Sequence, residues 1–246
     1  MRILLTNDDG ISSPGLAALR KALSSHDVWV VAPRTEQSGK SHSVTLFEPV
    51  CFQELEPQVF SCSGSPADCV MYSYRGALPV KPDIVISGIN IGPNLGTDLI
   101  YSGTAAAARQ AALMGYPGIA VSTNSFTEPL YFDTTADFVA DNLERLLSLW
   151  HPDHFININT PNVPEFTEGV RITALSRRMY EDEVVKFDAP RGGTYYFLQG
   201  GLIKDSQGGT DSECVAAGAV SVSPVFLEPQ NREEEEAYRK MEFTTR

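Results

Sequence analysis

Two adjacent carboxylates, Asp8 and Asp9, follow a short apolar run at residues 3–5. The run has the length of a buried strand, and apolar residues at helical spacing resume after Pro14. The two carboxylates are therefore expected where a strand ends and a loop leads into a helix. In open α/β sheets, ligands bind outside the carboxyl ends of the strands.

Two more polar loops follow apolar runs that predict buried strands. The loop after the run at 28–33 carries Ser38, and the loop after the run at 82–88 carries Asn90 and Asn94. Because parallel strands have their carboxyl ends at one edge of a sheet, these side chains should meet the two carboxylates. Such an all-oxygen set suits Mg²⁺, Mn²⁺ or Ca²⁺ better than zinc, which prefers histidine and cysteine.

Ser102, Gly103 and Thr104 are candidates for an anion-binding site. They stand at the expected start of an alanine-rich helix at 105–114. Backbone N–H groups at a helix N-terminus are unpaired, and small residues allow a ligand to approach them closely. The alternative is that Ser102 or Thr104 simply caps the helix. Both interpretations remain open from the sequence.

Other polar residues carry weaker signals. His42 could contact substrate or donate a proton, but an exposed loop histidine explains it equally well. Asp68, three residues after Ser65 at a helix start, predicts a capping box more strongly than a catalytic role. Arg177 and Arg178 could bind a second anionic group, although we expect an exposed pair.

Strands and helices alternate to about residue 160, which predicts a Rossmann-like, mainly parallel sheet with helices on both faces. Beyond that point the pattern indicates a hairpin that includes 191–198, a return strand within 215–225, and an exposed C-terminal arm. We predict an α/β core at 1–160 that carries the site and a smaller β-rich extension at 161–246, forming one structural unit.

Composition excludes several classes of protein. A net charge of −12 over 246 residues argues against binding of polymeric nucleic acid, which needs a basic face. No apolar run approaches the roughly 18 residues of a membrane span. The four cysteines form no CxxC pair, which favours reduced thiols and a cytoplasmic protein.

Familiar motifs for phosphate chemistry are missing. The carboxylates do not form DxD, and the glycine-rich loop is neither GxGxxG nor GxxxxGK[ST]. A phosphoacceptor signalling domain would need an aspartate at the end of the third strand, where this chain has Ser87 and Gly88.

Several segments together resemble the SurE (survival protein E) family, in the family's order and spacing: MRILLTNDDG, VVAP followed by QSGKSHS, GSPADC, PDIVISGINIGPNLGTD, IYSGTAAAA and FININTP. The resemblance is dense over 1–125 and thinner over 155–225. It implies a divalent-metal-dependent phosphatase of nucleoside 5′-monophosphates, with 3′-nucleotides and short polyphosphate as further substrates.

The resemblance also implies roles for individual residues. The family's metal ligands correspond to Asp8, Asp9, Ser38 and Asn90, and either aspartate could act as base or nucleophile. One divalent ion is expected, Mg²⁺ or Mn²⁺, with Ca²⁺ and Co²⁺ as alternatives.

The resemblance implies phosphate contacts from Asn94, Ser102, Gly103 and Thr104. Ser43 and His42, in the Ser38 loop, are further candidates for substrate contact. A homodimer or homotetramer with an exchanged C-terminal segment is implied, as is a nucleoside monophosphate partner. One departure is Arg34, where the family commonly has aspartate, which bears on the setting of the Ser38 loop.

The sequence therefore predicts a 5′-nucleotidase that acts through a metal-activated water. The rival hypothesis is a non-catalytic nucleotide- or metal-sensing domain that uses the same acidic pocket.

Overall fold

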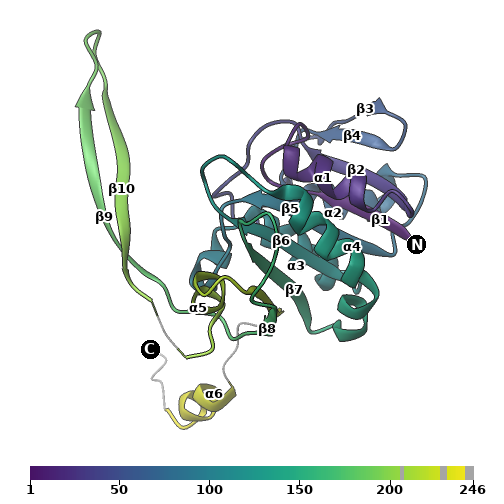
Figure 1. The fold of residues 1–246 in the computed structure, drawn as a ribbon. Helices are drawn as coiled ribbons and strands as arrows, with labels where there is room; N and C mark the ends of the chain where they lie inside the picture. The colour runs from purple at the N-terminus through teal and green to yellow at the C-terminus, as the bar shows by residue number, and fades with distance from the viewer. Residues whose placement is uncertain (206–207, 228–231, 242–246) are drawn as a thin grey trace.

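The computed structural model describes residues 1–205, 208–227 and 232–241, and most of them form one α/β body (Figure 1). Nine strands of the described residues make its sheet. Across the sheet they are β3 (Phe52–Glu56), β4 (Val59–Cys62), β2 (Asp27–Pro33), β1 (Arg2–Thr6), β5 (Ile84–Ile91), β6 (Gly118–Asn124), β7 (His154–Pro161), β11 (Val220–Phe226) and β8 (Val170–Ile172).

The sheet is mainly parallel, as predicted. The six strands from β4 to β7 run parallel to one another, whereas β3 pairs antiparallel with β4 and β11 pairs antiparallel with β7. The chain runs from β1 outwards to β2 and β4, and then crosses back to β5 on the other side of β1. The loops after β1 and β5 therefore diverge at a topological switch point, where such folds bind ligands.

Helices cover both faces of the sheet. α1 (Pro14–Ala22) and α4 (Phe132–Leu149) pack on one face, and α2 (Pro66–Tyr72) and α3 (Gly103–Leu113) pack on the other. The remaining short helices are η1 (Ser73–Ala77), η2 (Gly96–Ile100), α5 (Asp211–Ala216) and α6 (Arg232–Arg239). None of the helices in the described ranges combines the length and hydropathy needed to cross a bilayer.

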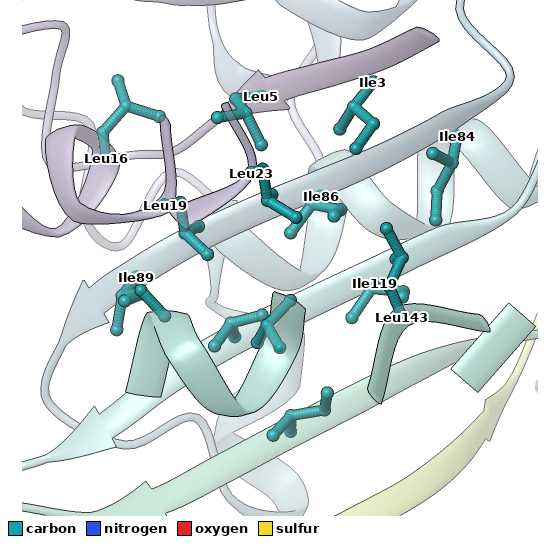
Figure 2. Packing of buried hydrophobic residues seen from close by; sticks show 14 of the residues in the cluster. Ile3, Leu5, Leu16, Leu19, Leu23, Ile84, Ile86, Ile89, Ile119 and Leu143 are labelled. Atoms are coloured by element: carbon teal, nitrogen blue, oxygen red, sulfur yellow. The ribbon is translucent and has the colours of Figure 1, made fainter. Parts of the chain in front are cut away.

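Alternation along each strand divides the core between the two faces. Ile3 and Leu5 point into the layer below α1 and α4, with Leu19 and Leu143 (Figure 2), while Leu4 points to the opposite layer. Successive strand side chains alternate between faces, so an apolar run buries both. Each fully buried leucine or isoleucine contributes about 1.5–3 kcal/mol, which makes β1 a rigid base for the loop that follows it.

β5 is longer than the sequence predicted. It continues past Gly88 to Ile91, and its register with β6 shifts between Ser87 and Asn90. Gly88 has φ +138°, and a Cβ there would lie 2.3 Å from the Val121 carbonyl oxygen, so only glycine fits. Irregularities of this kind redirect side chains next to functional sites. Asn90 thus belongs to the end of the strand and not to a free loop.

The C-terminal part contains the predicted return strand and hairpin. β11 and β8 extend the main sheet, whereas β9 (Met179–Asp188) and β10 (Thr194–Lys204) form a separate antiparallel pair that projects from the body (Figure 1). The smaller β-rich extension is confirmed. The predicted C-terminal arm lies partly outside the described residues, which include α6 of that region.

Candidate active site

A pocket of about 380 Å³ opens at the carboxyl edge of the sheet, beside the switch point. Five of the predicted site residues line it: Asp8, Ser38, Asn90, Asn94 and Ser102. They come from the loops after β1 and β2, from the end of β5 and the loop that follows it, and from the start of α3. The structure therefore brings together the three loops that the sequence placed at one sheet edge.

The start of α3 holds one of the protein's own carboxylates. Asp8 Oδ2 accepts a hydrogen bond from the Gly103 N–H at 3.1 Å, and Asp8 Oδ1 accepts one from the Thr104 hydroxyl. The positive end of the helix favours that negative charge. A Cβ at residue 103 would lie 2.8 Å from the Asp8 Cβ, so glycine is required here for close approach.

Ser102 has the capping role that the sequence left open. Its Oγ accepts the Ala105 N–H at 3.0 Å, and the side chain is buried in the pocket wall. Because the hydroxyl oxygen acts as the acceptor, its hydrogen remains available for donation to a ligand. Capping and ligand binding are compatible at this residue.

Asp9 lies beside Asp8 and is held more loosely. Its Oδ2 accepts one hydrogen bond, from the Ile91 N–H at 3.4 Å. Burial, followed by the charges of Asp8 and Glu36, raises the pKa of Asp9 to about 7. Burial also raises the pKa of Asp8. Among the ion pairs of the described residues, none neutralises either carboxylate.

Ser38 is positioned by its own loop and by Asp8. The Ser38 N–H and hydroxyl both donate to Glu36 Oε1, and the Gln37 N–H donates to the Asp8 carbonyl at 2.7 Å. The Arg34 guanidinium instead contacts Cys51 Sγ at 3.6 Å. The Ser38 loop is therefore held by contacts that do not involve the Arg34 side chain.

Asn90 presents an amide oxygen to the same place. Its Nδ2 donates to the Gly92 carbonyl at 2.8 Å and to the Ile91 carbonyl at 3.2 Å. These bonds fix the amide plane and leave Oδ1 with only a long contact of 3.4 Å from the Thr104 hydroxyl. The oxygen thus retains acceptor capacity for a cation.

These donors fit a hard divalent ion. Two carboxylates without a basic partner, an amide oxygen and a hydroxyl form an oxygen set that a cation would satisfy. The described residues contain no group of three or more His, Cys, Asp or Glu side chains arranged for a metal. The candidate set therefore depends on Ser38 and Asn90 as well as on the two aspartates.

Asn94 is fixed by Asn157 and Asn159, for which the sequence predicted no role. Asn159 accepts the Asn94 N–H at 2.8 Å and donates to its carbonyl at 2.9 Å, and Asn157 donates to the same carbonyl at 2.9 Å. The Asn94 Nδ2 also donates to Ser122 Oγ at 2.9 Å. The two asparagines within the apolar run at 155–159 could have indicated this clamp, by which we mean the hydrogen bonds from Asn157 and Asn159 to the Asn94 backbone. Buried amide groups require hydrogen-bond partners.

Four of the predicted phosphate and substrate residues do not line the pocket: Gly103 and Thr104, which donate to Asp8, and His42 and Ser43. His42 Nε2 donates to Gln110 Oε1 at 2.9 Å on the flank of α3, and burial lowers the pKa of His42. The Ser43 carbonyl accepts the Ser65 hydroxyl at 2.6 Å. Substrate contacts from His42 and Ser43 remain predictions.

The two other polar signals differ in outcome. Asp68 forms the predicted capping box, because Ser65 Oγ accepts the Asp68 N–H and Asp68 Oδ2 accepts the Ser65 N–H. The expectation of an exposed arginine pair was wrong for Arg178, whose side chain is largely buried. Its guanidinium pairs with Asp98 in the pocket wall and lies near Asp205, a contact between distant segments that the sequence pattern does not show.

Comparison with known proteins gives consistent matches. Residues 3–182 match the family described as Survival protein SurE. The 5′-nucleotidase SurE of Thermosipho africanus is 42% identical over 241 residues, covering 95% of this chain and 94% of the relative. That of Desulfitobacterium hafniense is 44% identical over 231 residues, covering 92% and 90%. The crystal structure of the SurE protein from Aquifex aeolicus matches with a TM-score of 0.85 at 37% identity, covering 97% of this chain and 98% of that one.

Proposed function

The chain belongs to the SurE family, and on that premise we propose that it is a divalent-metal-dependent 5′-nucleotidase. Relatives that match it over nearly its whole length are named 5′-nucleotidases, which supports hydrolysis of nucleotide phosphate esters. The observation that carries the metal dependence is the adjacent pair Asp8 and Asp9, neither of which has a basic partner among the described ion pairs. Asp8 lines the pocket together with the oxygen donors Ser38 and Asn90.

Asp8, Asp9, Ser38 and Asn90 would hold one divalent ion, Mg²⁺ or Mn²⁺ in the first instance, with Ca²⁺ and Co²⁺ as alternatives. A divalent ion bound there would polarise the phosphoryl oxygens and lower the pKa of an attacking water. Nucleoside 3′-monophosphates and short polyphosphate present the same phosphoryl oxygens, so they extend the proposed substrate range.

Side chains of the protein would bind the phosphoryl group and accept the proton of the attacking water. The Ser102 hydroxyl hydrogen and the second Asn94 Nδ2 hydrogen are suited to donate to phosphoryl oxygens, where charge develops during transfer. Both Asp8 oxygens are occupied by the start of α3, whereas Asp9 accepts one long hydrogen bond. Asp9 is therefore the better placed general base for the proton of the attacking water.

The test is phosphate release from nucleoside 5′-monophosphates before and after treatment with EDTA, followed by addition of Mg²⁺, Mn²⁺, Ca²⁺ or Co²⁺. We expect EDTA to abolish release and one of the divalent ions to restore it. An Asp9→Asn variant should lose more than about 100-fold in kcat with its thermal unfolding retained. Full activity in the chelated protein or in that variant would refute the proposal.

Tight nucleotide binding without turnover under every divalent ion would instead support the non-catalytic sensing domain. A calorimetric titration with a nucleoside monophosphate, run beside the activity assay, separates this outcome from an inactive preparation.

We also propose that the chain assembles as a homodimer or homotetramer. The support is the β9–β10 hairpin, which projects from the body (Figure 1). Four of its large apolar residues are exposed: Val184, Phe187, Phe197 and Leu198. Exposed apolar surface of this kind typically marks a protein interface. Exchange of a C-terminal segment remains part of the proposal.

Light scattering after gel filtration tests the assembly. A Leu198→Lys variant should shift the mass towards a smaller species, because a charge would be buried in the interface. The matched control is Gln53→Lys, at an exposed position of β3 that lies outside the hairpin. Equal masses for the wild type and both variants would exclude the hairpin face of Leu198 from the interface.

A further inference from the structure

We propose that Phe126 determines substrate specificity by stacking against the base of the nucleotide, and that it favours purine nucleotides. The inference rests on the proposed nucleotidase function. It assigns a base-binding role to a residue outside the sequence motifs, beyond β6 in the loop that leads to α4.

The lining of the pocket is polar at its floor and aromatic at its mouth. The floor carries the polar groups described above, and the mouth carries the rings of Tyr101, Phe126 and Tyr180. These rings come from three separate segments. The exposed fraction is 66% for Tyr101, 76% for Phe126 and 43% for Tyr180. Large aromatic side chains that converge while exposed at a polar pocket indicate a planar ligand, because each ring leaves a face uncovered.

Phe126 is held in place although it is exposed. Its ring lies directly on the backbone of Gly92, where a Cβ would come within 2.0 Å of Phe126 Cε1. Gly92 lies between Asn90, at the end of β5, and Asn94, in the loop that follows, so the ring lies on the segment that carries two of the polar groups of the pocket. The Phe126 ring therefore has a fixed position relative to the phosphate end of a bound nucleotide.

Tyr180 makes more contacts with other protein groups than Phe126 does. Its hydroxyl donates to Asp98 Oδ2 at 2.6 Å, and the Arg178 guanidinium lies over its ring at 5.6 Å from the centroid. Tyr180 thus forms a fixed wall, whereas Phe126 has a free face. That difference favours Phe126 over Tyr180 as the stacking platform, and Phe126 is also the most exposed of the three rings.

The chemistry of a nucleobase suits this platform. Every base has a π face, and stacking on an aromatic side chain needs no specific hydrogen bond. A purine offers a larger ring system to Phe126 than a pyrimidine does, and a sugar phosphate without a base offers none. We therefore expect the preference order adenosine 5′-monophosphate, cytidine 5′-monophosphate, ribose 5-phosphate.

The experiment compares Phe126→Ala with the wild type on those three substrates, using the metal-loaded protein. We expect KM for adenosine 5′-monophosphate to rise about 5- to 10-fold with kcat unchanged. The kcat/KM for ribose 5-phosphate should be unaffected, so the discrimination between the two substrates should shrink. Phe126→Trp should restore the low KM, because it replaces the stacking surface.

Phe47→Ala is the matched control, since Phe47 is 97% exposed and lies outside the pocket wall. Equal changes on adenosine 5′-monophosphate and ribose 5-phosphate, or no change on either, would overturn the assignment and leave the nucleotidase function standing. A wild type that hydrolyses none of the three substrates under any divalent ion would instead refute the proposed function, and the stacking role with it.

Discussion

The carboxyl edge of the sheet and the β9–β10 hairpin use side chains in opposite ways. At the sheet edge, polar groups such as Asp8, Asn94 and Asn159 are buried and hydrogen-bonded to segments far away in the sequence. On the hairpin, apolar groups such as Phe197 and Leu198 are exposed. Buried polar groups must find partners within the fold, whereas exposed apolar groups gain stability only from a further surface.

This difference predicts that substitutions at the sheet edge change activity and stability more than substitutions on the hairpin do. The sheet edge is specified by internal distances, so a single added atom can displace a functional group. The hairpin is specified mainly by its own backbone pairing, so its side chains should be tolerant in the isolated chain. The two regions meet at Arg178, which precedes β9 and pairs with Asp98 in the pocket wall.

The largest contrast is expected between two glycine-to-alanine changes. Gly103→Ala would place a Cβ 2.8 Å from the Asp8 Cβ, whereas Gly201→Ala in β10 has no heavy atom within 4 Å of its new Cβ. Because a displacement of about 1 Å can cost about 100-fold in rate, we expect a loss of that order in kcat/KM for Gly103→Ala. Steady-state assays should show wild-type rates for Gly201→Ala. Equal effects of the two changes would remove the distinction between the regions.

A smaller effect is expected from Asn159→Ala. The substitution leaves the buried Asn94 N–H without its acceptor, which costs about 1–3 kcal/mol in the free energy of unfolding. Urea unfolding measures this loss, and activity should fall with it because Asn94 is no longer held. The control is Gln199→Ala in β10, which should change neither quantity. Unchanged unfolding of Asn159→Ala would show that the clamp contributes nothing.

Arg178→Met should destabilise the contact between the sheet edge and the hairpin. Its ion pair with Asp98 is partly shielded, so we expect a loss of about 1–2 kcal/mol. Hydrogen exchange should speed up at the base of the hairpin and at η2 before it does so in β1. Lys186→Met is the control, since it removes an exposed hairpin ion pair with Asp188 and should have little effect. Uniform acceleration over the whole chain would argue against a local clamp.

The smallest expected effect is a pH dependence from His42. Burial lowers its pKa in the folded protein, so below the ordinary value of 6.5 the unfolded chain binds more protons than the folded chain. Stability from this group is therefore lost as the pH falls from 6.5 towards the lower folded value. Melting temperatures between about pH 7.5 and about pH 5.5 should fall less for His42→Gln than for the wild type. Parallel curves would exclude a contribution from His42.

The convergence of Asp8, Ser38 and Asn90 was predictable because strand ends follow from apolar run length, and parallel strands share an edge. The capping box at Ser65 and Asp68 was predictable because its atoms lie within one helical turn. The α/β fold followed from the same periodicity.

The tertiary structure decided which groups these residues contact. The α3 N-terminus binds Asp8, Asn159 holds Asn94, Arg178 is largely buried, and Phe126 lies on Gly92; each pairing joins segments far apart in the sequence. The sequence by itself determined the fold class and the oxygen-rich loops at one sheet edge, because periodicity and local spacing encode them. Strand register and the irregularity at Gly88 decided how those loops are held, because they depend on packing that no local pattern contains.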